Sequence, residues 1–143
     1  MSIFSKRIET LKSLMSSKGY NAFYIANITN VRYLSGFTGS SGFLLITDEG
    51  DHFFSDGRYT EQSKSEVLDF KIHITTNHLK LINEEKLLQS NWMVCFEGNH
   101  LSFDTYNRIK TSCEINELIP VNDIIENIAA VKDQSEIDAL QTA

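Results

Sequence analysis

The tetrapeptide Asp56-Gly57-Arg58-Tyr59 carries the residue types best suited to binding chemistry in this sequence. It follows an apolar run, and its Asp-Gly pair is typical of a turn. An arginine on such a turn can donate two parallel hydrogen bonds to a carboxylate, which belongs either to a ligand or to the protein itself. Spacing alone favours the second interpretation, an internal ion pair of Arg58 with Asp56 or Glu61.

The histidines and cysteines do not predict a metal site. They lack the H-E-x-x-H and C-x-x-C spacings of metal motifs: His52, His73, His78, His100, Cys95 and Cys113. The best candidate ligand is His100 in Glu97-Gly98-Asn99-His100, because it follows an apolar strand whose end could bind a ligand. An ordinary loop histidine is the favoured interpretation. We therefore expect no metal ligands in this chain.

Other catalytic chemistries are disfavoured by local context. The glycine-rich segment 36–42 precedes a strand instead of a helix, and no Lys-Ser or Lys-Thr pair follows it, so a phosphate cradle is not predicted. Ser40 and Ser41 lack the G-x-S-x-G elbow of a serine hydrolase. Three aspartates around a hairpin could suggest a two-metal nuclease, but turn chemistry explains them better: Asp48, Asp51 and Asp56.

The elements that position these residues are predicted by periodicity and turn signals. Helices are expected over 5–18, from the Asp56 turn to about 68, over 79–89 and over 102–110. Strands are expected over 22–25, 43–47, 52–55, 70–75, 92–96 and 115–121. A turn of uncertain type is expected at 31–34, and 36–42 is expected to be a flexible loop. The alternation predicts an α/β fold, a three-layer sandwich with a mixed β-sheet flanked by helices.

Composition describes an ordinary globular domain. The chain has 143 residues, 41% of them hydrophobic, which is enough for a core without disulfides. With 13 Lys and Arg against 19 Asp and Glu, the net charge of −6 repels phosphate backbones, so no nucleic-acid partner is expected. No signal peptide or membrane span is predicted, so we expect a cytoplasmic protein without a membrane partner. Cys95 and Cys113 are expected to be buried free thiols.

The end of the sequence predicts a second domain. Ser135-Glu136-Ile137-Asp138 has the form of a helical capping box, and the chain ends too soon afterwards for a self-sufficient helix. We therefore expect one domain over 1–130, followed by a linker and the start of a helix over 131–143 that enters a domain absent from this chain.

Three ordered strings resemble a known family. They are Tyr33-Leu34-Ser35-Gly36-Phe37-Thr38-Gly39-Ser40-Ser41-Gly42, then Asp56-Gly57-Arg58-Tyr59-Thr60-Glu61-Gln62, then Val131-Lys132-Asp133-Gln134-Ser135-Glu136-Ile137. Together they are similar to the N-terminal, creatinase-like domain of Xaa-Pro aminopeptidases and Xaa-Pro dipeptidases (prolidases). The resemblance covers essentially the whole chain.

The resemblance implies a two-domain metallopeptidase that removes the residue preceding proline in Xaa-Pro peptides. It implies a ribonuclease H-like fold for this domain, which carries no cofactor, and two divalent metal ions, commonly manganese, in the absent catalytic domain. It also implies a homodimer in which N-terminal loops reach the partner subunit's active site. A free-standing module of the same fold that binds a peptide or protein partner is the alternative.

By that similarity Arg58, Phe37 and Tyr33 become candidate substrate-binding residues. Arg58 would reach toward the neighbouring subunit's cleft, and the two aromatic residues would form a wall beside the substrate. The simpler alternatives are that Tyr33 packs in the core and that Phe37 anchors its glycine-rich loop. Asp56 is expected to orient Arg58 or to cap a helix, and not to ligate a metal.

Overall fold

The computed structural model describes residues 2–131 of the chain. All of the predicted linker after residue 131, with the capping box at Ser135, therefore lies outside the described residues. No helix in the described range is long and apolar enough to cross a bilayer.

A mixed sheet of six strands forms the middle layer, in the order β4-β3-β2-β1-β5-β6. The antiparallel hairpin β2–β3 pairs with β1, and the three other pairings, β1–β5, β5–β6 and β3–β4, are parallel. β1 and β5 lie in the middle of the sheet and are almost entirely buried, which explains why they read as short apolar runs. The strands are β1 (Ala22–Ile25), β2 (Phe43–Thr47), β3 (Gly50–Ser55), β4 (Lys71–Ile74), β5 (Met93–Glu97) and β6 (Glu117–Val121).

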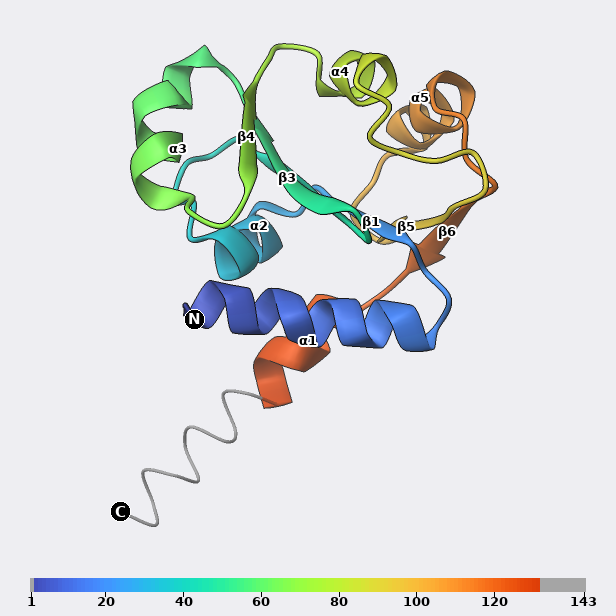
Figure 1. Cartoon of the computed structure of the whole chain (residues 1–143), viewed down its shortest axis with the longest axis horizontal. Coiled ribbons are helices and arrows are strands. Elements are labelled where there is room, and N and C mark those ends of the chain that lie inside the picture. Colours follow the sequence, from blue (N-terminus) through green and yellow to red (C-terminus); the bar gives the residue numbers. More distant parts are fainter. Residues whose placement is uncertain (1, 132–143) are drawn as a thin grey trace.

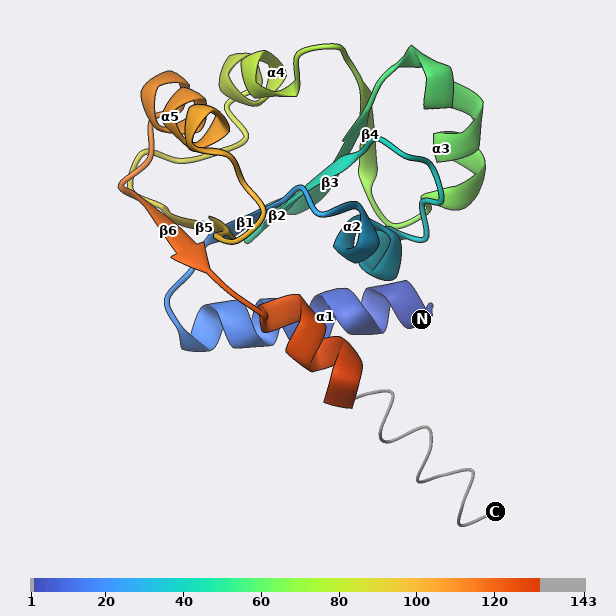
Figure 2. The same cartoon turned by 180° about the vertical axis from the view of Figure 1, so that it is seen from behind.

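Helices cover both faces of the sheet (Figures 1 and 2). Below it in these views lie α1 (Ile3–Ser17), α2 (Ile28–Ser35) and a helical segment over 124–131. Above it lie α4 (His78–Glu84) and α5 (Phe103–Ser112), while the short 3-10 helix η1 (Gly57–Tyr59) and α3 (Thr60–Glu66) lie beside β4. The predicted three-layer α/β sandwich is confirmed.

Two hydrophobic clusters fill the spaces between the layers. Leu11 of α1 and Leu34 of α2 belong to the cluster below the sheet, and Leu79 and Ile109 belong to the cluster above it. Successive strand residues point to opposite faces, so neighbouring phenylalanines of β3, at positions 53 and 54, enter different clusters. Both cysteines are buried and free, as predicted.

The turn of uncertain type predicted at 31–34 is part of helix α2 instead. Asn27 caps this helix by accepting a hydrogen bond from the Thr29 amide at 3.1 Å, and Gly36 ends it at φ 83°. The prediction was wrong because Asn27 and Asn30 are typical loop residues, whereas here one is a helix cap and the other is buried. Tertiary contacts of Asn30, described below, outweigh its low helix propensity.

Two other helices differ from the prediction. α4 ends at Glu84 and not at residue 89, because Lys86 adopts a left-handed backbone conformation with φ 53°. Leu87 and Leu88 nevertheless pack, partly buried, against the upper cluster. The helix after the Asp56 turn begins as η1 before it becomes α3.

Candidate functional site

Asp56 builds the turn that carries Arg58. The residue follows the last residue of β3 in an extended conformation, with φ −99° and ψ 175°. Its carboxylate oxygen Oδ1 accepts a hydrogen bond from the Arg58 backbone amide at 3.0 Å, which caps η1. The side chain of Asp56 therefore fixes the backbone from which Arg58 projects.

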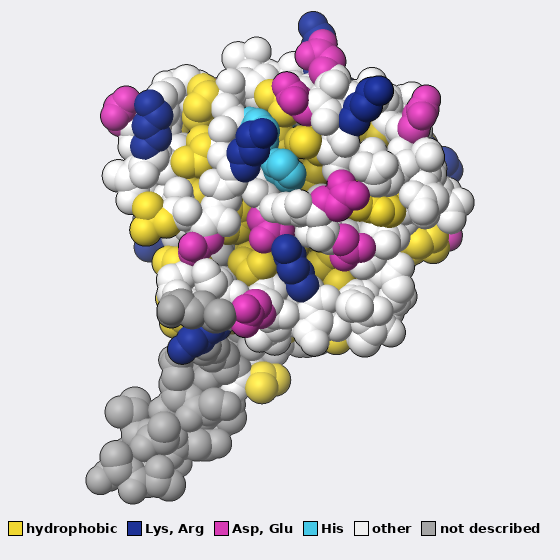
Figure 3. Space-filling model, in the orientation of Figure 1, with side chains coloured by type: hydrophobic (Ala, Val, Ile, Leu, Met, Phe, Trp, Pro, Cys, Tyr) yellow, Lys and Arg dark blue, Asp and Glu magenta, His cyan; other side chains and the backbone are white. Residues whose placement is uncertain are grey.

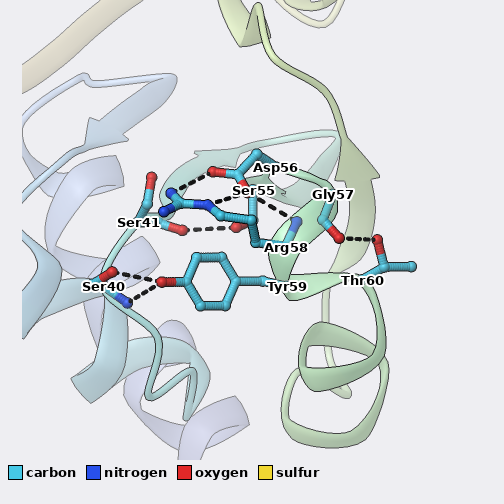
Figure 4. A network of polar contacts seen from close by, with 8 residues as sticks. All are labelled: Ser40, Ser41, Ser55, Asp56, Gly57, Arg58, Tyr59 and Thr60. Carbon is cyan, nitrogen blue, oxygen red and sulfur yellow. Dashed lines mark hydrogen bonds and ion pairs between the residues drawn. The ribbon is translucent and has the colours of Figure 1, made fainter.

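The same carboxylate holds the Arg58 guanidinium (Figure 4). Nε donates to Oδ1 and Nη2 donates to Oδ2, both at 2.9 Å, so the pair is bidentate. Hydrogen bonding to Arg58 lowers the pKa of Asp56 below its ordinary value, and the Asp56 carboxylate raises the pKa of Arg58. Of the two partners expected for Arg58, the structure shows Asp56. The Glu61 carboxylate lies instead 3.9 Å from Lys64 Nζ.

One edge of the guanidinium stays available for a ligand. Asp56 occupies the side of the fork formed by Nε and Nη2, and no described residue makes a hydrogen bond to Nη1. The Arg58 side chain is 68% exposed. Because arginine has five N–H donors, a held Arg58 can still offer its end-on edge to a second carboxylate or carbonyl.

Tyr59 connects this turn to the glycine-rich loop. Its hydroxyl lies 2.6 Å from Ser40 Oγ, as Figure 4 shows, and hydrogen bonding to Ser40 lowers the pKa of Tyr59. The edge of its ring meets the Phe37 ring, with centroids 5.4 Å apart, and the Arg58 guanidinium carbon lies 5.2 Å from the Tyr59 centroid. Tyr59 thus lies between Arg58 and the core.

The loop expected to be flexible is held at three points. Glu66 accepts hydrogen bonds from the Thr38 amide and hydroxyl, both at 2.8 Å, at its start. Tyr59 holds its middle, and at its end the Ser41 carbonyl accepts a hydrogen bond from Ser55 Oγ at 2.7 Å. A side chain at position 39 would overlap the Phe37 ring, so the glycine there is required by close packing. These contacts fix the loop beside Arg58.

A cavity of about 490 Å³ opens beside the Arg58 turn. Phe43, Phe54 and His78 supply its aromatic lining, and Asp56 and Arg58 are also among its lining residues. The other lining residues are Ser41, Ser55, Gly57, Thr75 and Thr76. A cavity with aromatic walls and a few polar groups is typical of small-molecule and peptide sites.

His78 is neutral in this cavity at pH 7. Its ring stacks on Phe43, with centroids 4.1 Å apart, and its Nε2 lies 2.6 Å from the Tyr24 hydroxyl. Burial, followed by the positive charge of Arg108, lowers the pKa of His78 to about 4. No sequence signal indicated that His78 would join the Arg58 turn, because the two lie on different elements.

The structure places the two aromatic candidates away from the Arg58 edge. Phe37 is fully buried against Phe53, with ring centroids 4.8 Å apart, and meets Arg58 only through Tyr59. Tyr33 is half-buried on α2, where the Arg7 guanidinium carbon lies 4.0 Å from its ring centroid. Tyr33 lines a separate cavity of about 730 Å³ beside α1 and the 124–131 helix.

Glu97 has a structural role. From the sequence it was considered only as a neighbour of the candidate ligand His100. It is 7% exposed, and its Oε1 accepts hydrogen bonds from the amides of Ala26 and Asn27 at 2.7 and 2.8 Å. His100 is exposed in the loop that follows. Across residues 2–131, no group of three or more His, Cys, Asp or Glu side chains could hold a metal ion.

Comparisons with known proteins agree with this architecture. The family model for the creatinase/prolidase N-terminal domain matches residues 7–131. The uncharacterized peptidase YqhT of Bacillus subtilis is 31% identical over 145 residues, which cover 96% of this chain and 39% of that protein. The chain thus spans about two-fifths of the length of this curated relative.

Two solved structures are similar over nearly their whole length. The aminopeptidase P (Xaa-Pro aminopeptidase) of Streptococcus thermophilus is 26% identical with a TM-score of 0.78, covering 90% of this chain and 99% of that one. The N-terminal domain of the cytoplasmic peptidase PepQ from Mycobacterium tuberculosis is 27% identical with a TM-score of 0.75, covering 85% and 97%. With a family match over most of its length, this chain belongs to the creatinase/prolidase N-terminal domain family.

Proposed function

We propose that this chain is the non-catalytic N-terminal domain of an Xaa-Pro peptidase, either an aminopeptidase or a dipeptidase, that acts in the cytoplasm. Membership of the family and likeness to an Xaa-Pro aminopeptidase and to a cytoplasmic peptidase support this assignment. We also propose that a catalytic domain outside this chain holds two divalent ions, manganese in kind; residues 2–131 contain no group of three or more His, Cys, Asp or Glu side chains that could hold one.

The domain shapes the substrate site of the partner subunit in a homodimer, and Arg58 is the residue that contacts the peptide. The observation that carries this role is the geometry of the Arg58 side chain. Asp56 orients the guanidinium from one side, while the end-on edge is exposed and free of described partners. Arg58 also lines the cavity with aromatic walls beside this turn. Phe37 contributes indirectly, by packing against Tyr59, whereas Tyr33 lines the separate cavity beside α1.

Replacing Arg58 tests this proposal in the full-length enzyme. Arg58→Ala should lower kcat/KM for an Xaa-Pro peptide about tenfold to a hundredfold, the loss expected for a charge-assisted contact. The melting temperature should hardly change, since exposed ion pairs add little stability. Arg58→Lys should restore little, because lysine keeps the charge but not the planar fork. Wild-type kcat/KM in Arg58→Ala would remove Arg58 from the substrate site.

A further inference from the structure

Two histidines meet on neighbouring parallel strands outside the Arg58 cavity. In the β3–β4 register, His52 pairs with Lys71 and Phe54 pairs with His73. Because side chains two residues apart share a face of the sheet, the two imidazoles project from the same face. His52 Nδ1 lies 3.0 Å from His73 Nε2, and the ring centroids are 5.1 Å apart.

The imidazole of His73 is held in place by packing. The Phe54 ring stacks on it, with centroids 4.9 Å apart and an interplanar angle of 17°. His52 also contacts Phe54, with centroids 6.4 Å apart. Since Phe54 is itself 1% exposed, the aromatic support beneath the pair is part of the core. Phe54 therefore gives the pair a rigid aromatic support on the core side.

Both rings are neutral at pH 7. Burial, then the nearby His73 and Lys71, lowers the pKa of His52 to about 4. Burial and Lys71 also lower the pKa of His73, and the opposing effect of Glu85 is weaker. A neutral imidazole keeps one nitrogen lone pair, which is the form that binds transition metals.

The pair can be reached from solvent. Both side chains are half-buried, and in the view of Figure 3 histidine side chains (cyan) reach the surface in the region of β3 and β4, next to a basic side chain. The described residues supply no cluster of three ligands. Water would therefore complete the coordination of an ion held by this pair.

We propose that His52 and His73 form a two-ligand site for a divalent ion of copper or nickel, which clips the edge strand β4 to β3. Metal–imidazole bonds of about 2.0–2.1 Å that reach two nitrogens 3.0 Å apart enclose an angle of about 90° at the metal. That angle fits two adjacent positions of the square-planar or tetragonal geometry of Cu²⁺ and Ni²⁺ better than tetrahedral Zn²⁺. This site needs neither peptide nor catalytic domain, so it goes beyond the proposed function.

Binding requires a tautomeric shift and a rotation of the imidazoles, because hydrogen-bonded ring nitrogens point at each other and not at a common ion. In the metal-free pair, one ring donates its proton to the other, since neutral imidazole has one donor and one acceptor nitrogen. For both facing nitrogens to ligate, that proton moves to the second nitrogen of its own ring. No proton is released at pH 7 and no group is oxidised or reduced. The charged groups near the pair are Lys71 of β4, which opposes a cation, and Glu85 after α4, which favours it.

Copper titration of the 143-residue chain at pH 7 tests the site. We expect one Cu²⁺ per chain by calorimetry, and an electron paramagnetic resonance spectrum with hyperfine coupling to two imidazole nitrogens. His52→Gln and His73→Gln should each weaken binding at least about tenfold, because one ligand is lost. His100→Gln is the matched control, since it removes an exposed loop histidine and should change nothing. A spectrum showing one nitrogen, or equal affinity in His73→Gln and His100→Gln, would overturn the proposal.

Thermal unfolding gives a second measurement, which depends on the bound ion joining β4 to β3. An ion bound only by the native pair raises the melting temperature in proportion to the logarithm of its concentration. We expect Ni²⁺ to raise the melting temperature of the wild type and of His100→Gln by several degrees. It should leave the melting temperatures of His52→Gln and His73→Gln unchanged. Zn²⁺ should raise it less. An equal rise in all four proteins would show that nickel acts elsewhere and would contradict the site.

Discussion

Asn30 donates its side-chain amide to the buried carboxylate of Glu97 at 2.6 Å, and this contact joins the first turn of α2 to the end of β5. The same nitrogen lies 2.7 Å from Glu126 Oε1 on the 124–131 helix. Glu97 also accepts the backbone amides of Ala26 and Asn27 that precede α2. One buried carboxylate thus fixes the position of α2 relative to the sheet.

Removing the Glu97 carboxylate should destabilise the domain strongly. Glu97→Ala leaves two backbone amides and the Asn30 side chain without their acceptor, and unsatisfied buried donors are costly. We expect the free energy of unfolding, measured by urea denaturation, to fall by about 3 kcal/mol. Glu126→Gln is the control, because that side chain is exposed and a loss below about 1 kcal/mol is expected there. Similar losses in the two variants would show that Glu97 does not organise this junction.

Tyr59→Phe should loosen the glycine-rich loop without disturbing the core. The variant keeps the ring that packs on Phe37 but loses the hydroxyl that meets Ser40. We expect the backbone amides of 40–42 to exchange with deuterium about fivefold faster, the effect of one net hydrogen bond. Tyr106→Phe, on the opposite side of the sheet beside Phe96, should leave this loop unchanged. Unchanged exchange in Tyr59→Phe would mean that Glu66 and Ser55 suffice to hold the loop.

The sequence predicts the layers better than the site because periodicity reports burial, whereas the site depends on contacts between distant segments. The sequence alone predicted the apolar face of α1, the apolar strands and the Asp56 turn. Nothing local paired Tyr59 with Ser40 or His52 with His73, since the members of each pair are separated by 19 and 21 residues. α2 was missed because the tertiary bond of Asn30 to Glu97 stabilises it.

Stability should decrease in mild acid because three histidines are neutral in the folded state. The pKa values of His52 and His78 are lowered to about 4, and that of His73 is also lowered, from an ordinary value of 6.5. As the pH falls from about 6.5 to about 4, the unfolded chain binds more protons than the folded one. The free energy of unfolding should therefore be highest above pH 6.5 and fall through this window. His78→Phe should make urea midpoints measured from pH 7 to 4.5 less pH-dependent, and His100→Gln should not. A flat pH profile in the wild type would contradict the buried, neutral state of these rings.

This chain on its own should neither hydrolyse Xaa-Pro peptides nor bind two manganese ions. Residues 2–131 offer no converging set of carboxylates and histidines, and the proposed imidazole pair does not suit a hard ion such as Mn²⁺. Calorimetric titration with Mn²⁺ and a peptidase assay on the same preparation provide the check. Turnover above a protein-free blank, or two tightly bound ions, would place catalysis in this domain.

Mixing two impaired variants of the full-length enzyme tests the central claim most directly. One variant carries Arg58→Ala, and the other carries an intact Arg58 with an inactivated catalytic domain. If Arg58 serves the partner's cleft, each mixed dimer holds one complete site, and equal mixing should restore about a quarter of wild-type activity after subunit exchange. If Arg58 acts within its own subunit or only braces its turn, mixing should restore nothing above the sum of the two variants, and that result would contradict the account.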